Sequence, residues 1–144
     1  MISTPQIKRD AITGYGADLV LCESTPTSRK ETCAKIAEEK DFEVIHPYDD
    51  HRVMAGQATL GLELHRAVPD LDAVLVPISG GGLTSGVALA TKALNPKCKV
   101  IAVEPEGKGL GKCLREKERL WTNPPQFLNT IAEGIKTQQV RPNS

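Results

Sequence analysis

The sequence of 144 residues predicts an α/β fold with a mainly parallel open sheet and helices on both faces. Two observations favour this class. Short apolar runs alternate with longer segments of helical periodicity, as in βαβ units, whose right-handed crossovers bring strands together in parallel. A glycine-rich run at residues 79–82 (SGGG) follows one apolar run and precedes a helical segment, which is typical of strand-to-helix turns in α/β proteins.

The first third of the chain is predicted to contain two helices, each followed by a short strand. The first helix covers about residues 5–15, with Pro5 in a first-turn position and glycines at its end. The second begins at a Thr-Pro-Thr run suited to an N-cap and covers residues 25–40. Apolar runs at 17–22 and 42–45 predict strands, and a polar joint at 48–51 follows.

The remainder of the chain alternates in the same way. Residues 53–68 place apolar side chains on one helical stripe, although Gly56 and Gly61 each weaken a helix by about 1 kcal/mol relative to alanine. We therefore expect these glycines to serve close packing or ligand approach. A strand at 74–78, a helix that ends at Leu94 and a strand at 99–104 come next. The charged segment 108–119 is expected to present a solvated face.

The composition argues against nucleic-acid and membrane partners. The formal net charge is zero and aromatic residues make up 3% of the chain, so no basic or base-stacking surface is expected. No apolar run is long enough to span a bilayer, and the N-terminus lacks the apolar core of a signal peptide. The four cysteines have neither CxxC nor zinc-ligand spacing, which is typical of reduced thiols. We therefore expect a cytoplasmic protein.

The glycine run is the main functional signal. A strand, a glycine turn and a helix N-terminus together form an anion site, because the first N–H groups of a helix lack internal partners and the helix dipole favours negative charge. Glycine also lets the backbone approach a ligand closely. The favoured ligand is a phosphate. The alternative is a tight turn that only shapes the packing of strand and helix.

A dinucleotide-binding fold is a second interpretation of the same run. Gly80-x-Gly82-x-x-Ser85 approximates the GxGxxG/A fingerprint, and Glu104 ends the next strand, where a ribose-binding acid would lie. Against it, this unit is not the first βα unit of the chain, and serine replaces the last glycine of the fingerprint. Three consecutive glycines after a serine also suit a single phosphate better than a pyrophosphate.

Motifs along nearly the whole chain resemble those of one enzyme family. They are Tyr15-Gly16-Ala17, Cys22-Glu23, Ser28-Arg29, His46-Pro47, Ala55-Gly56-Gln57-x-Thr59, Val76-Pro77 with the glycine run, Leu94-Asn95-Pro96, Val103-Glu104-Pro105 and residues 130–134 (TIAEG). Their order and spacing are similar to those of the serine racemases and the serine/threonine dehydratases, which are fold type II pyridoxal-phosphate enzymes. The resemblance implies that residues 1–47 are part of the small domain and 48–144 part of the large, cofactor-binding domain.

The resemblance also implies roles for individual residues. The family's phosphate-binding loop falls on Ser79, Gly80, Gly81 and Gly82, with Leu83 next; Ser79 replaces a glycine but keeps the backbone N–H and adds a hydroxyl donor. The other implied positions are Gly134 beside the cofactor ring, Arg29 and His46 near the substrate, and Lys8, Ala11 and Tyr15 where animal racemases bind ATP as an effector. The alternatives are a solvent-facing charge for Arg29 and a packing role for His46.

The racemases also have a divalent-cation site after a strand that ends in Glu-Pro. Glu104 matches its first ligand, but residues 106–110 offer no aspartate at the position of the second, and Lys108 brings a positive charge. Mg²⁺ and Ca²⁺ require several oxygen ligands. We therefore expect weak or absent activation by these ions, with Glu106 as a substitute ligand.

The implied activity is racemisation of serine, or elimination of ammonia from serine or threonine, with pyridoxal phosphate as cofactor and a homodimer as the complete form. The resemblance places the family's Schiff-base lysine before residue 1, so we expect no catalytic residue in this chain, which resembles a central fragment and is expected to be inactive alone. A non-catalytic remnant that binds a phosphate ligand or a full-length partner is the remaining alternative. These residues do not decide between serine and threonine, or between racemisation and elimination.

Overall fold

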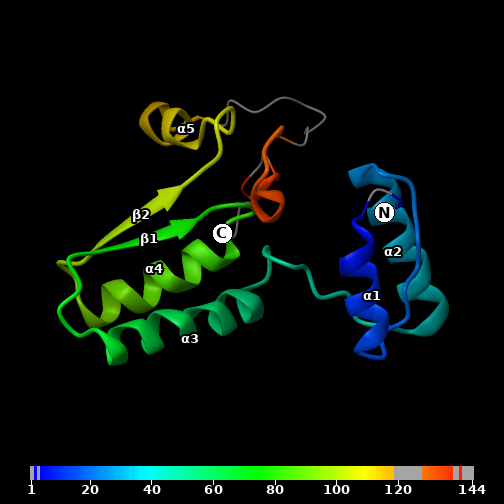
Figure 1. The fold of residues 1–144 in the computed structure, drawn as a ribbon, viewed down its shortest axis with the longest axis horizontal. Helices are drawn as coiled ribbons and strands as arrows, with labels where there is room; N and C mark the ends of the chain where they lie inside the picture. Colours follow the sequence, from blue (N-terminus) through cyan, green and yellow to red (C-terminus); the bar gives the residue numbers. More distant parts are fainter. Residues whose placement is uncertain (1, 3, 119–127, 138–139, 141–144) are drawn as a thin grey trace. The chain divides into compact units, whose positions relative to one another are not determined.

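The computed structural model describes residues 2, 4–118, 128–137 and 140. The chain divides into two compact units, Met1–Ile45 and His46–Ser144, each of which is described by itself (Figure 1). The boundary lies close to the one expected between the two domains. The assignment of these units to the family's small and large domains stays a prediction. Among the described residues, no helix combines the length and the apolar character that a membrane crossing requires.

The first unit contains α1 (Gln6–Gly14) and α2 (Pro26–Lys40), as predicted. Thr25 caps α2, because its hydroxyl accepts a hydrogen bond from the backbone N–H of Ser28 at 3.1 Å. The prediction of strands at 17–22 and 42–45 is wrong, because both segments are irregular in the described structure. A strand forms only where its backbone groups pair with a neighbouring strand, and a hydrogen bond from Ile2 N to Cys22 O does not extend into a ladder.

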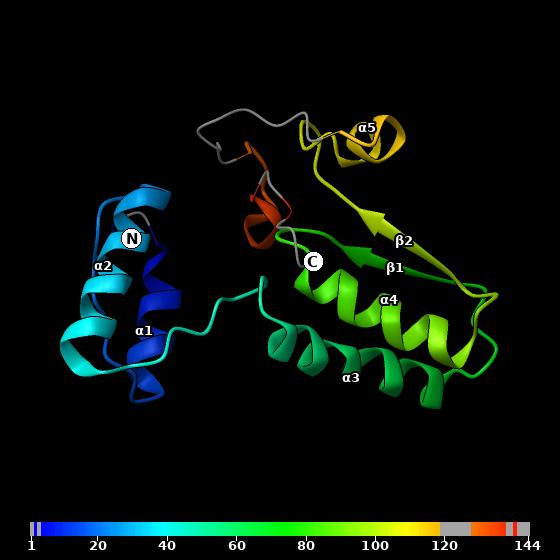
Figure 2. The same cartoon turned by 180° about the vertical axis from the view of Figure 1, so that it is seen from behind.

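The second unit is a parallel α/β arrangement. Strands β1 (Ala73–Pro77) and β2 (Lys99–Val103) pair in parallel, with Ala73 opposite Lys99 and Pro77 opposite Val103. Helix α4 (Gly82–Leu94) forms the crossover between them, and α3 (His51–Ala67) precedes β1. Figure 2 shows α4 between α3 and the two strands. Helix α5 (Leu110–Glu116) follows β2, and a short 3₁₀-helix, η1, covers Glu133–Ile135. The predicted α/β class with a parallel sheet is confirmed.

The core of this unit lies between the strands and α4. Val74 and Val76 on β1, Val87 on α4 and Cys98 before β2 form one buried cluster. Side chains alternate between the two faces of a strand, so Leu75 points away from α4 and is 65% exposed. Its neighbours Ile101 and Val103 on β2 are also exposed. The described helices α3 and α4 therefore cover one face of the sheet.

Close packing of α3 against α4 depends on small residues. A Cβ atom added at Gly61 would lie 2.7 Å from the Cβ of Ala90, so glycine is required there for the helices to approach. Gly86 on α4 is in the same situation against the backbone of α3 near Met54. Of the two expected roles, close packing is confirmed for Gly61. Gly56 has nothing within 4 Å of a Cβ atom among the described residues, so close packing does not account for it, and ligand approach stays a prediction there.

Candidate functional site

The glycine run lies where β1 turns into α4. Gly81 is the N-cap of α4 and has a φ of 113°, a left-handed conformation that favours glycine. The first turn of α4 has no acidic residue and no side-chain cap. By contrast, Thr25 caps α2 and Asp50 caps α3 with side-chain oxygens. Because no side chain fills this role, the N-terminus of α4 is suited to an anion that would accept hydrogen bonds from its N–H groups.

A cavity of about 450 Å³ lies in front of this turn. All of the cofactor residues predicted for the second unit take part in its lining, including Gly134, which lies in η1 far along the chain. The lining residues are Pro47, Tyr48, Gln57, Pro77, Ser79, Gly80, Gly81, Gly82, Leu83, Thr84, Gly134 and Ile135. None of these described lining residues carries a charged side chain. Both the volume and the mixture of apolar walls with backbone donors are typical of a cofactor pocket.

Tyr48 explains why Gly80 and Gly82 are glycines. A Cβ atom at Gly80 would overlap the Tyr48 ring, and one at Gly82 would lie 2.9 Å from the Cα and carbonyl oxygen of Tyr48. From the sequence, Tyr48 was expected only in a polar joint, and its contact with the glycine run was not predicted. The available signal was an aromatic residue in a chain that has few, two residues before the aspartate that caps α3.

His46 fixes the turn that presents Tyr48. Its Nδ1 atom accepts a hydrogen bond from Asp49 N at 2.9 Å and a longer one from Tyr48 N at 3.4 Å. The His46 and Tyr48 rings meet edge to face, with their centroids 4.6 Å apart. His46 is absent from the cavity lining described above. These contacts support the packing role, and the predicted contact with substrate stays a prediction.

Lys108 is buried, contrary to the sequence prediction. It was expected on a solvated face, but its side chain is only 1% exposed. The ammonium group donates hydrogen bonds to the carbonyl oxygen of Ser79 at 2.8 Å and to that of Thr137. Burial lowers the pKa of Lys108, and the negative charge of Glu104 partly opposes this shift. Gly107 and Gly109, with φ of 86° and 71°, turn the backbone so that the side chain points inward.

Glu104, the predicted metal ligand, faces the start of α5. Its carboxylate accepts hydrogen bonds from Leu110 N at 2.9 Å and from Gly111 N at 3.4 Å. Among the described residues, no cluster of three or more His, Cys, Asp or Glu side chains is arranged to hold a metal ion. The role of Glu104 in metal binding stays a prediction.

The remaining predicted residues belong to the Met1–Ile45 unit. Arg29 is exposed on α2. Lys8 and Ala11 lie on α1 with the spacing of one helical face, and Tyr15, which is 91% exposed, ends that helix. Their roles toward substrate and effector stay predictions.

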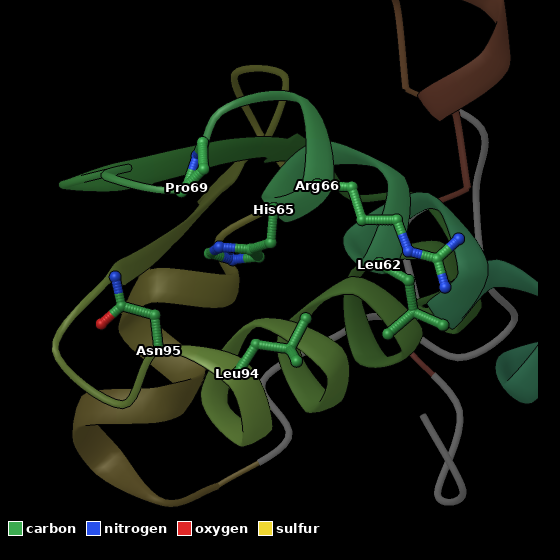
Figure 3. Close-up of a pocket in the computed structure, with 6 residues that line it drawn as sticks. All are labelled: Leu62, His65, Arg66, Pro69, Leu94 and Asn95. Atoms are coloured by element: carbon green, nitrogen blue, oxygen red, sulfur yellow. The ribbon is translucent and has the colours of Figure 1, made fainter.

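A second cavity, of about 390 Å³, lies where α3 and α4 end (Figure 3). It is lined by Leu62, His65, Arg66, Pro69, Leu94 and Asn95. The Arg66 guanidinium points away from the His65 ring in this view, and the Asn95 amide is hydrogen-bonded to Leu71 O. Because its polar groups do not converge, this cavity is a poorer candidate for a cofactor than the one at the glycine run.

The structure places a cavity at the first turn of a crossover helix in an α/β unit, where the backbone N–H groups are suited to an anion. A family model described as "Pyridoxal-phosphate dependent enzyme" matches residues 2–144, and the chain belongs to this family. The resemblance stated from the motifs is thereby confirmed, together with its cofactor class. The family match favours pyridoxal phosphate over the dinucleotide interpretation.

Individual relatives carry related names. The serine racemase of Arabidopsis thaliana is 41% identical over 92% of this chain and 39% of its own length. The beta-hydroxyaspartate dehydratase of Paracoccus denitrificans is 46% identical over 72% of this chain and 33% of its own. The chain therefore spans about two fifths or less of the curated relatives it matches.

Two solved structures are similar throughout this chain. A pyridoxal 5'-phosphate-dependent aspartate racemase has a TM-score of 0.93 and 52% identity, covering 96% of this chain and 42% of its own. The processed threonine deaminase isoform 2 of Solanum lycopersicum has a TM-score of 0.84 and 35% identity, covering 97% and 38%. These proteins are enzymes that act on amino acids, and fold type II is the fold they share with this chain.

Proposed function

We propose that residues 79–82 hold the phosphate of pyridoxal phosphate in an amino-acid racemase or ammonia-lyase. The observation that supports this most directly is the N-terminus of α4, which has no side-chain cap and opens on a cavity without charged lining side chains. Glycines in this run also allow the backbone N–H groups to approach a phosphate closely. The residues present therefore fit the family's cofactor.

Each part of the chain has a distinct task in this proposal. When bound, pyridoxal phosphate supplies an electron sink for removal of the α-proton of an amino acid. The backbone N–H groups of Gly80–Gly82 bind the phosphate, while Leu83 and Ile135 exclude water from the cavity beside it. Gly134 leaves space at the wall, since nothing lies within 4 Å of a Cβ atom built there among the described residues.

Two substrate classes are candidates. The first is serine and threonine, as the names of the serine racemases and threonine deaminases suggest. The second is amino acids with a β-carboxylate. The aspartate racemase is 52% identical to this chain over the aligned residues, and the beta-hydroxyaspartate dehydratase is 46% identical. We propose the first class, together with a homodimeric and cytoplasmic enzyme, from the motif resemblance.

A chimera tests the substrate class. Residues 1–144 would replace the matching segment of the Arabidopsis serine racemase, and D-serine, pyruvate, 2-oxobutyrate and D-aspartate would be assayed from the L-amino acids. We expect activity on L-serine or L-threonine at the level of the host enzyme. Racemisation of L-aspartate that the host lacks would favour the second class. A chimera that binds the cofactor without turnover would favour a non-catalytic remnant.

A further inference from the structure

The buried ammonium of Lys108 connects two separate segments of the cavity wall. Ser79, which accepts one of its hydrogen bonds at 2.8 Å, lies in the glycine run and lines the cavity. Thr137, which accepts another, follows Gly134 and Ile135, which also line it. Both acceptors are 29 residues from Lys108 along the chain, so one side chain joins three distant segments.

The bond to Ser79 acts directly on the first donor of the glycine run. The carbonyl of Ser79 and the N–H of Gly80 belong to one planar peptide group, with the oxygen and the hydrogen on opposite sides. A donor that holds the Ser79 oxygen behind the loop therefore fixes the direction of the Gly80 N–H in front of it. Without that donor, the peptide group would be free to rotate about its flanking bonds.

The charge of Lys108 also matters to an anion in the cavity. The described lining residues have no charged side chain, so the phosphate charge meets only neutral groups there, the backbone N–H groups and polar side chains such as the Ser79 hydroxyl. The Lys108 ammonium lies one hydrogen bond behind the glycine run and is shielded from solvent, with 1% of the residue exposed. A buried charge is screened less by salt than an exposed one, so its attraction extends to the front of the loop.

We propose that Lys108 is a positioning residue of the phosphate site: it holds the Ser79 carbonyl, aims the Gly80 N–H group at the start of the glycine run and favours an anion in the cavity. The identity of that anion as the phosphate of pyridoxal phosphate rests on the proposed function. The positioning of the glycine run itself does not, since the hydrogen bonds to Ser79 and Thr137 join atoms of this chain alone.

Lys92 offers a matched control. Its ammonium also donates to two backbone carbonyl oxygens, those of Pro96 and Cys98, but at the C-terminal end of α4, away from the glycine run. Lys108→Met keeps the length of the side chain and removes its donors and charge, and Lys108→Arg restores both. Lys92→Met removes an equivalent bridge elsewhere in the same unit.

The amide resonances of Gly80, Gly81 and Gly82 would be compared in the full chain by ¹⁵N NMR, and the dissociation constant for pyridoxal phosphate measured by titration. Lys108→Met is expected to shift these three resonances and to weaken cofactor binding about tenfold, with partial recovery in Lys108→Arg and no change in Lys92→Met. If the three glycine resonances of Lys108→Met coincide with those of the wild type, the inference is overturned.

A measurement on the wild type keeps the inference testable if Lys108→Met does not fold. With ¹⁵N-labelled lysine, addition of pyridoxal phosphate or inorganic phosphate is expected to shift the Lys108 side-chain signal and leave that of Lys92 in place. Binding that leaves the Lys108 signal unchanged would overturn the charge effect. If the wild type binds neither compound, the proposed function fails for this chain, while the comparison of glycine resonances still decides the role of Lys108.

Discussion

Glu104 and Lys108 both lie within five residues of the end of β2, and their polar atoms have different hydrogen-bond partners. The carboxylate of Glu104 accepts hydrogen bonds from two backbone N–H groups of α5, while the Lys108 ammonium is bonded to backbone carbonyls. Glu104 also stabilises the charged form of Lys108, against the effect of burial. A cation is therefore already present in the chain beside this carboxylate.

We predict that Mg²⁺ does not raise the melting temperature of the chain. The Glu104 oxygens are engaged at the start of α5, and the adjacent ammonium repels a second cation. Glu104→Ala is expected to destabilise the protein by about 1 kcal/mol, as loss of a helix-capping acceptor does, equally with and without Mg²⁺. Thermal unfolding with and without the ion measures both effects. A Mg²⁺-induced increase that disappears in Glu104→Ala would contradict this.

The two glycines of helix α3 have different surroundings. Gly56 faces open space among the described residues, whereas Gly61 packs on Ala90 and the backbone of Val87. The sequence pattern treats the two alike, since both interrupt the same apolar stripe.

This difference predicts opposite effects of the same substitution. Gly56→Ala is expected to stabilise the protein by about 0.5–1 kcal/mol, because alanine restricts the unfolded chain and favours a helix. Gly61→Ala is expected to destabilise it by about 1–3 kcal/mol, because the new methyl group forces α3 and α4 apart. Denaturant unfolding of the two variants measures both values. Equal effects of the two substitutions would contradict the packing of α3 on α4.

The cap of α3 predicts a dependence on pH. The Asp50 side chain accepts hydrogen bonds from the side chain and backbone N–H of Arg52, which lower the pKa of Asp50 from 3.8 to about 2. Its contribution to stability is therefore full above pH 3.8 and is lost as the pH falls toward 2. The difference in unfolding free energy between the wild type and Asp50→Ala should narrow over that interval, and a constant difference would be inconsistent with the cap.

Helix limits were predictable from the sequence because their signals are local. Thr25 before Pro26 indicated the start of α2, and the glycine run indicated the start of α4. The strands expected at 17–22 and 42–45 failed because a strand depends on a partner that the local pattern does not reveal. Tyr48 and Lys108 were missed for a similar reason: their partners in the glycine run lie about thirty residues away along the chain.

At the scale of the whole chain, the lysines are compared with the lining of the cavity at the glycine run. None of the described lining residues is a lysine, although every lysine of the sequence lies within the described residues. Lys108 and Lys92 are each bonded to two carbonyl oxygens. Covalent chemistry with the aldehyde of the cofactor requires an accessible amine held beside it.

We therefore predict that these 144 residues alone do not turn over L-serine. Purified chain would be incubated with pyridoxal phosphate and L-serine, D-serine and pyruvate would be assayed, and free cofactor would be the control. Borohydride reduction and mass spectrometry should find no lysine labelled selectively. Turnover above that of free cofactor, abolished by a single Lys→Ala substitution, would show that a lysine of this chain is catalytic.

The central claim is that the glycine run at the start of α4 binds the phosphate of pyridoxal phosphate. Its most direct test is a titration of the chain with pyridoxal phosphate, inorganic phosphate and pyridoxal, followed by the amide resonances of Gly80–Gly82. We expect the two phosphate compounds to shift these resonances and pyridoxal to leave them in place. Gly81→Asp, which introduces a negative charge and a side chain at a left-handed position, should weaken binding of pyridoxal phosphate at least about tenfold, while Gly56→Asp should not. Binding of pyridoxal phosphate that leaves the three resonances unchanged, or that Gly81→Asp does not weaken, would contradict the assignment.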